Sequence, residues 1–290
     1  MDKTLPLPVE TRATLSAALT PLGDEIVAIA SALWEVEPSA GSRVQELIQG
    51  KSLPESDFAD VTISVAAATD EFNAFVWVLG GDGAYGPSMA SLTRSCVETL
   101  GRAWWLMASS SAAVLAHRSA AFQVSESAYI ANNKGEVARR DAFGQIRRLK
   151  GDEITAYAAE RFEARRVEGE KAKAPGYREL ATDLLAAVNS PNSGLDYSHL
   201  SGAAHGERTA LGSFGNPRPG PPGTARVGLD LPVTHANLYI WILVHSIDRV
   251  LVSLFEMWGE ASDDLHRRWA RAIRPCEAIL EQTLKPFYEE

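Results

Sequence analysis

The most apolar long segment of the chain is residues 233–258, VTHANLYIWILVHSIDRVLVSLFEMW. Its apolar residues spread around most of a helical circumference, which predicts a central, buried helix. His245, Asp248 and Arg249 interrupt the segment, and no run approaches the roughly 18 apolar residues of a membrane span. Because a buried charge is costly unless it is paired, other helices should bring partners to these three side chains. The segment therefore predicts a polar site inside a helical core.

Apolar residues at spacings of three and four predict further helices along the chain. The long runs are residues 58–79, 88–108 and 111–132, and a shorter helix follows Pro175, over residues 177–189. The first of these carries a continuous apolar seam, which is typical of a helix packed lengthwise on another.

Two prolines are expected to interrupt helices, because proline lacks a backbone N–H and clashes with the preceding turn. Pro21 separates two short predicted helices, 11–19 and 24–36. Pro275 lies near the middle of the last predicted helix, 262–284, where we expect a kink or a break.

These elements predict an all-α fold, an antiparallel helical bundle. We expect residues 1–57 to form an N-terminal helical extension and residues 58–290 the core of the bundle. Residues 212–232, GSFGNPRPGPPGTARVGLDLP, are too rich in proline and glycine for regular structure and predict a long loop. This loop is either a lid between two helices or a surface excursion without a role.

Composition limits the function classes. The chain has 28 Lys and Arg against 37 Asp and Glu, a net charge of -9, which argues against a surface devoted to non-specific nucleic-acid binding. Residues 136–173 are highly charged; they are either solvated helix faces or a basic ridge for an RNA backbone. The two cysteines make no disulfide framework, and the N-terminus lacks an apolar signal region, so we expect a cytoplasmic protein without a membrane anchor.

One predicted helix carries Arg94, Glu98 and Arg102 at spacings of four, so they share a face, and Trp105 lies on the same side. Alone, this pattern is a solvated face with ion pairs between successive turns. If a second helix covers the face, the two guanidinium groups and the carboxylate become a preorganised anion site.

A second helix carries Tyr197, Ser201 and His205 at the same spacing, so a phenol, a hydroxyl and an imidazole point the same way. His205 is either a hydrogen-bonded structural residue or an acid–base group. His199 points elsewhere and is expected to be structural.

Taken together, the three helices bring complementary charges, and we expect them to meet in one site. The candidate acids or bases are Glu98, His205 and His245. The candidate substrate-binding residues are Arg94, Arg102, Tyr197, Ser201, Asp248 and Arg249. The sequence contains no HExxH, Glu-x-x-His or Cys/His cluster and no G-x-S-x-G, so neither a metal, another cofactor nor a serine hydrolase is predicted.

Two segments, RSCVETLGRAWWL (94–106) and YSHLSGAAHG (197–206), with the apolar helix that follows, resemble uncharacterised helical bacterial proteins related to the HEPN superfamily. The resemblance implies an all-α fold with a HEPN-like core, frequent dimerisation, and metal-independent ribonuclease or nucleotide-modifying activity. The ribonuclease motif of that superfamily places an Arg four to six residues before a His. This chain has no such Arg before His199, His205 or His245, so only His205 is carried over from the resemblance.

We therefore expect a metal-independent acid–base enzyme, a transferase or hydrolase, that acts on a phosphate-bearing or otherwise anionic substrate. The substrate would be a nucleotide, an RNA end, or a group carried on RNA such as an aminoacyl-tRNA; RNA is a candidate partner, a membrane is not, and a homodimer is expected. The alternative is a non-catalytic helical module for ligand binding or dimerisation, in which the polar groups satisfy one another.

Overall fold

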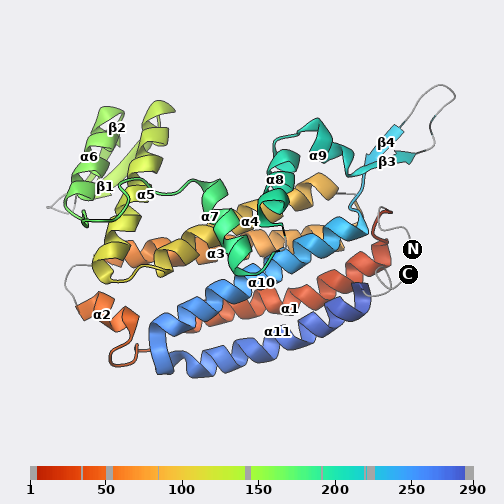
Figure 1. The fold of residues 1–290 in the computed structure, drawn as a ribbon, viewed down its shortest axis with the longest axis horizontal. Coiled ribbons are helices and arrows are strands. Elements are labelled where there is room, and N and C mark those ends of the chain that lie inside the picture. Colours follow the sequence, from red (N-terminus) through yellow and green to blue (C-terminus); the bar gives the residue numbers. More distant parts are fainter. Residues whose placement is uncertain are drawn as a thin grey trace.

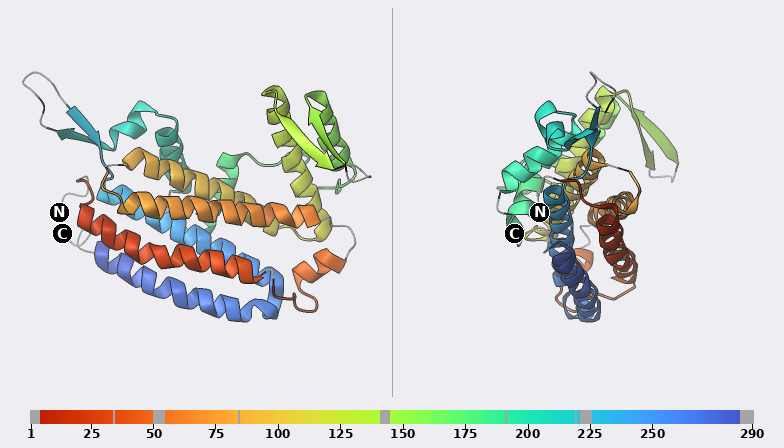
Figure 2. Two further views of the ribbon diagram at one scale, coloured as in Figure 1. Left: turned by 180° about the vertical axis from the view of Figure 1, so that it is seen from behind. Right: turned by 90° about the vertical axis from the view of Figure 1, so that its right-hand side faces the viewer.

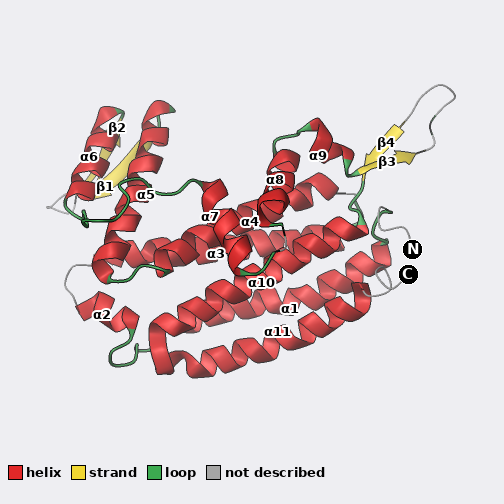
Figure 3. Ribbon diagram, in the orientation of Figure 1, coloured by secondary structure: helices red, strands yellow, loops and turns green. Residues whose placement is uncertain are grey.

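The computed structural model describes residues 5–33, 35–49, 55–83, 85–140, 145–190, 192–218, 220 and 226–284. The long helices are α1 (Val9–Leu33), α3 (Glu55–Gly80), α4 (Gly86–Met107), α5 (Ala112–Asn132), α10 (Val233–Trp258) and α11 (Asp263–Leu284). The shorter elements are α2 (Arg43–Gln49), α6 (Asp152–Glu163), α7 (Tyr177–Ala187), α8 (Ser193–Ala204), α9 (Arg208–Gly212) and the 3₁₀ turn η1 (Gly259–Ser262). The strands are β1 (Glu136–Arg140), β2 (Ile146–Lys150), β3 (Gly215–Arg218) and β4 (Arg226–Leu229). Helices predominate in Figure 3, which confirms the predicted all-α class.

The core lies between long helices that run side by side (Figures 1 and 2). α3 packs on α1 and α4, α1 packs on α11, and α10 contacts α4, α7 and α11. The prediction of a central, buried α10 is confirmed, because buried side chains occur from its first residue, Val233, to its last, Trp258. Leu15 and Leu19 of α1 belong to the same apolar cluster as α10. The division at residue 57 stays a prediction.

Neither proline breaks its helix. α1 is one continuous helix through Pro21, so the expected interruption there is wrong. α11 also continues through Pro275, so the helix is not broken there, and the alternative of a kink stays a prediction. A proline removes one backbone hydrogen bond. In α1, Leu19 and Leu22 are buried on either side of Pro21, so burial of the continuing apolar face offsets that loss.

The structure contains two antiparallel hairpins that the sequence analysis did not predict. β1 pairs with β2, with Glu136 opposite Lys150, so residues 136–140 and 146–150 are strands and not helix faces. β3 pairs with β4 inside the predicted loop 212–232, which is therefore partly regular. Asp230 accepts hydrogen bonds from Arg218 Nη2 at 2.6 Å and Asn216 Nδ2 at 3.0 Å, which ties this hairpin to the start of α10. Its tip, residues 219 and 221–225, lies outside the described residues, and a lid role stays a prediction.

Two helical segments, Val9–Leu33 and Val233–Thr283, are long and apolar enough to cross a membrane by length and composition alone. In the second, 61% of the most apolar window is buried against other parts of the chain, as in the core helix of a folded domain. Length and composition alone are thus weak evidence that either segment crosses a membrane.

The position of α7 depends on a glycine. A Cβ on Gly101 of α4 would lie 2.8 Å from the backbone oxygen of Leu180 in α7, closer than real Cβ atoms approach. Gly101 thus lets the two helix backbones meet, and α7 in turn packs on α8.

We predict that Gly101→Ala lowers the free energy of unfolding by about 1–3 kcal/mol, because the added methyl group has no room against the α7 backbone. Gly194→Ala is the matched control: a Cβ there meets nothing within 4 Å, and alanine favours the helix by up to about 1 kcal/mol. Urea denaturation of both variants measures the difference. Equal effects of the two substitutions would contradict the close approach.

Candidate functional site

The candidate site begins with an ion pair on one face of α4. Arg94 Nε donates to Glu98 Oε1 at 2.6 Å, one helical turn further along. Both side chains are largely buried, with 20% and 16% of their surfaces exposed, since α8 packs against α4 here. The predicted pairing is therefore real, and the face is covered rather than solvated.

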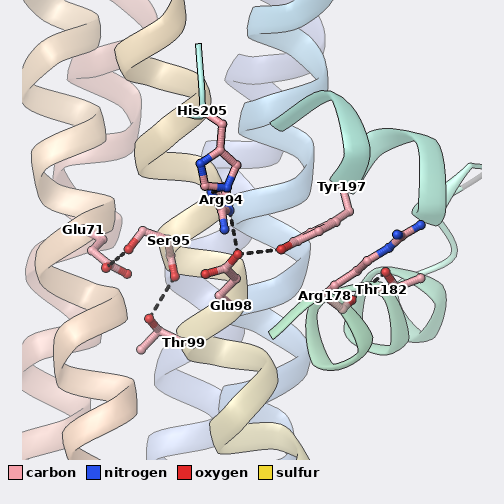
Figure 4. Close-up of polar contacts among 9 residues, drawn as sticks. All are labelled: Glu71, Arg94, Ser95, Glu98, Thr99, Arg178, Thr182, Tyr197 and His205. Atoms are coloured by element: carbon pink, nitrogen blue, oxygen red, sulfur yellow. Dashed lines mark hydrogen bonds and ion pairs between the residues drawn. The ribbon is translucent and has the colours of Figure 1, made fainter. Parts of the chain in front are cut away.

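Two residues of the α8 segment complete the group. Tyr197 Oη donates to the same Glu98 oxygen at 2.7 Å, and His205 Nε2 lies 3.0 Å from Arg94 Nη1. His205 is the residue that ends α8, and its ring is exposed. Figure 4 shows these four side chains, Arg94, Glu98, Tyr197 and His205, pointing toward one another from two elements. We call them the Arg94 cluster.

The contact between Arg94 and His205 depends on the tautomer of the ring. A guanidinium group can only donate, so the contact is a hydrogen bond in the tautomer that has its lone pair on Nε2 and its proton on Nδ1. The cluster thus presents an imidazole beside a fixed cation, with one carboxylate and one phenol behind them.

Charge within the cluster is mutually stabilised. Burial alone would lower the pKa of Arg94, but the hydrogen bond and negative charge of Glu98 outweigh it and raise that pKa. Burial raises the pKa of the Tyr197 phenol, and the charge of Glu98 raises it further. Arg94 therefore stays a cation and Tyr197 a neutral donor at neutral pH.

A second carboxyl group, Glu71 of α3, lies beside the cluster on the other side of α4, and sequence reasoning missed it. Ser95 donates to Glu71 Oε1, while Glu71 Oε2 is buried with no hydrogen-bond partner in the described part of the chain. Burial raises the pKa of Glu71, and the charge of Glu98 raises it further, against hydrogen bonds from Ser95 and Thr99. The only signal in the sequence is that Glu71 directly precedes Phe72 of the apolar seam.

Arg102 does not join the cluster. Its guanidinium pairs with Glu126 of α5 and lies 4.6 Å from the centroid of the Phe122 ring. The third residue of the predicted anion face therefore pairs with α5, and the structure does not bring Arg102 into contact with the Arg94 cluster. The sequence gives the spacing along α4 but not the position of α5.

The polar residues of α10 also stay apart from the hydrogen bonds of the cluster. Asp248 Oδ1 accepts a hydrogen bond from Trp269 Nε1 of α11 at 2.8 Å. The ring of His245 packs on the ring of Trp241, with the two centroids 4.7 Å apart. Arg249 is exposed, so the expected burial of its charge is wrong, and water solvates it instead. Ser201 lies half-buried on α8 between Tyr197 and His205.

His199 helps to attach α8 to α10, which agrees with a structural role. Its Nε2 lies 2.7 Å from Tyr239 Oη, and its ring stacks on His235 with centroids 4.6 Å apart. Burial lowers the pKa of His235 to about 4, with a smaller contribution from His199. Burial also lowers the pKa of His199, so the stacked pair is neutral at neutral pH.

Three cavities of the described chain lie elsewhere: between α1, α3 and α10, along α1 and α3, and between α5 and α6. Among the described residues, no group of three or more His, Cys, Asp or Glu side chains is placed to hold a metal ion. Comparisons of the chain with family models, curated proteins and solved structures give no match.

We predict that acid weakens the fold partly through His235. Its pKa is lower in the folded protein than in the unfolded chain, so its contribution to stability is complete above about pH 6.5 and is lost as the pH falls toward 4. The loss at pH 4 is about 3 kcal/mol. His235→Phe should show a shallower decline between pH 7 and pH 4, measured by urea denaturation at several pH values. Parallel declines for the two proteins would count against this assignment.

Proposed function

We propose that the protein is a metal-independent acid–base enzyme for a phosphate-bearing or otherwise anionic substrate. The observation that carries the proposal is the exposed imidazole of His205, whose Nε2 lies 3.0 Å from Nη1 of the Arg94 guanidinium. A cation and a basic nitrogen at this separation suit an anion that carries a proton to be removed, or a neighbouring hydroxyl to be activated.

In this proposal each residue of the Arg94 cluster has one role. When the anion binds, Arg94 Nη1 donates to it in place of His205 Nε2. The exchange frees the lone pair of Nε2, which then accepts a proton from the substrate as general base. Glu98 and Tyr197 are positioning residues, because they fix the guanidinium and the end of α8 through hydrogen bonds. Positioning of this kind lowers the entropic cost of reaching the reactive geometry.

The substrate class follows from this chemistry. A nucleotide, an RNA end or a group carried on RNA such as an aminoacyl-tRNA supplies both an anion and a hydroxyl or amine, and the reaction would be a transfer or a hydrolysis. We further propose that the helices form an antiparallel bundle with a HEPN-like core, that the protein acts in the cytoplasm, and that it forms a homodimer. These three proposals rest on the sequence.

We predict that Arg94→Ala weakens binding of mononucleotides or tRNA by about 10- to 100-fold, the effect of losing one charged hydrogen bond. His205→Ala should lower turnover by about 10²- to 10⁴-fold, as for loss of a general base. Calorimetry measures binding, and assays with nucleotides and aminoacyl-tRNA measure turnover. His266→Ala, an exposed histidine on α11, is the control and should match the unchanged protein. Unchanged binding and turnover in both site variants would refute the proposal.

A non-catalytic module is the second candidate, and one observation favours it. Glu98 Oε1 accepts from both Arg94 and Tyr197, so the buried part of the cluster is already satisfied without a ligand. Under this reading, Glu98→Gln lowers the melting temperature and changes no ligand affinity.

A further inference from the structure

A groove runs along the outer surface between α1 and α3, on the face opposite α7 and α8. The rear view in Figure 2 shows these two helices side by side with no other element over them. Two cavities of about 500 Å³ and 540 Å³ lie along the pair, and Asn73 lines both. The helices approach closely between them, where a Cβ on Gly23 would lie 2.0 Å from Asn73 Oδ1. We call the two cavities together the α1–α3 groove.

Large apolar side chains stand at the edges of this groove and are exposed to water. Trp77 has 81% of its surface exposed and Ile63 has 65%, both on α3, and Val27 of α1 has 49%. Each lines one of the two cavities. Exposed aromatic and aliphatic residues beside a groove mark a surface that binds another molecule.

The charged residues that line the groove indicate the chemical class of the surface that would bind there. Among the described residues that line the two cavities, the charged ones are Asp24 and Asp70, and both are acidic and exposed. A second copy seated here by two-fold symmetry would bring the same acidic residues against one another, and an anionic lipid surface would be repelled. The complementary surface is apolar and basic.

The length of the groove fits a helix. Its α3 side extends from Thr62 to Gly81, which corresponds to roughly 28 Å at 1.5 Å per residue. Apolar side chains at a spacing of three to four residues on an incoming helix can enter such a groove. We propose that the α1–α3 groove is a docking site for a basic amphipathic helix of another protein, with Trp77 as the main apolar anchor and Asp24 and Asp70 as the partners of its lysines or arginines.

The test uses the full chain and two synthetic 18-residue peptides. One has leucines along one helical face and lysines on the other, and the second has glutamates in place of the lysines. Isothermal titration should show binding of the leucine–lysine peptide that weakens as salt rises, because salt screens the charge pairs. The glutamate peptide should bind at least about tenfold more weakly. No binding of the lysine peptide, or equal binding of both peptides, overturns the proposal.

Variants locate the binding. Trp77→Ala and the double change Asp24→Lys with Asp70→Lys should each weaken binding of the lysine peptide by about tenfold or more. The matched controls are Tyr129→Ala, an aromatic residue of α5 with 72% of its surface exposed, and Asp183→Lys on α7, and both should bind like the unchanged protein. Equal binding by the groove variants and the controls overturns the proposal.

Light scattering tests whether a second copy of the chain, instead of another protein, occupies the groove. If the protein is a dimer, and Trp77→Ala makes it a monomer while Tyr129→Ala does not, a second copy occupies the groove. The proposed partner class is then wrong. An unchanged oligomeric state together with weakened peptide binding supports the proposal.

Discussion

The carboxylate of Glu98 is the interaction on which the candidate site depends. It accepts one hydrogen bond from its own helix, from Arg94, and one from another helix, from Tyr197. A carboxylate in such a half-buried position is stable only while its donors are present. These hydrogen bonds in turn fix two groups. One is the Arg94 guanidinium, which contacts His205, and the other is Tyr197 of α8, the helix that ends at His205. Loss of this one acceptor would therefore release the cation, the phenol and the imidazole together.

The sequence predicted the helices more successfully than the site. α10 begins and ends where its apolar pattern does, and α3, α4 and α5 lie within a few residues of the predicted ranges. Patterns of this kind depend on burial, which repeats with the helical turn. Pro21 was misread because local preference competes with tertiary packing, and packing decided there. The β3–β4 hairpin was missed because its hydrogen bonds, including those from Asn216 and Arg218 to Asp230, join residues that no periodic pattern relates.

The candidate site shows the same limit in another form. Arg94 and Glu98, and Tyr197 and His205, could each be paired from spacing, because both pairs lie on single helical segments. Which helix covers α4 could not be predicted, and so Arg102, which contacts α5, was wrongly assigned to the cluster. Glu71 was missed because it follows Asp70, and two adjacent acidic residues in an amphipathic helix are expected to face water. In Figures 1 and 2, α8 lies on the other side of the bundle from α1. A partner helix on the outer side of α1 and α3 would therefore leave the α8 side uncovered.

The central claim, that Glu98 joins α4 to α8, is tested most directly by a double-mutant cycle. Unfolding free energies are measured for the unchanged protein, Glu98→Gln, Tyr197→Phe and the double variant. We expect the two changes to be non-additive, with a coupling energy on the order of 1 kcal/mol or more, the contribution of a hydrogen bond to a charged group. Additivity to within about 0.3 kcal/mol would show that the two side chains do not interact, and would contradict the account.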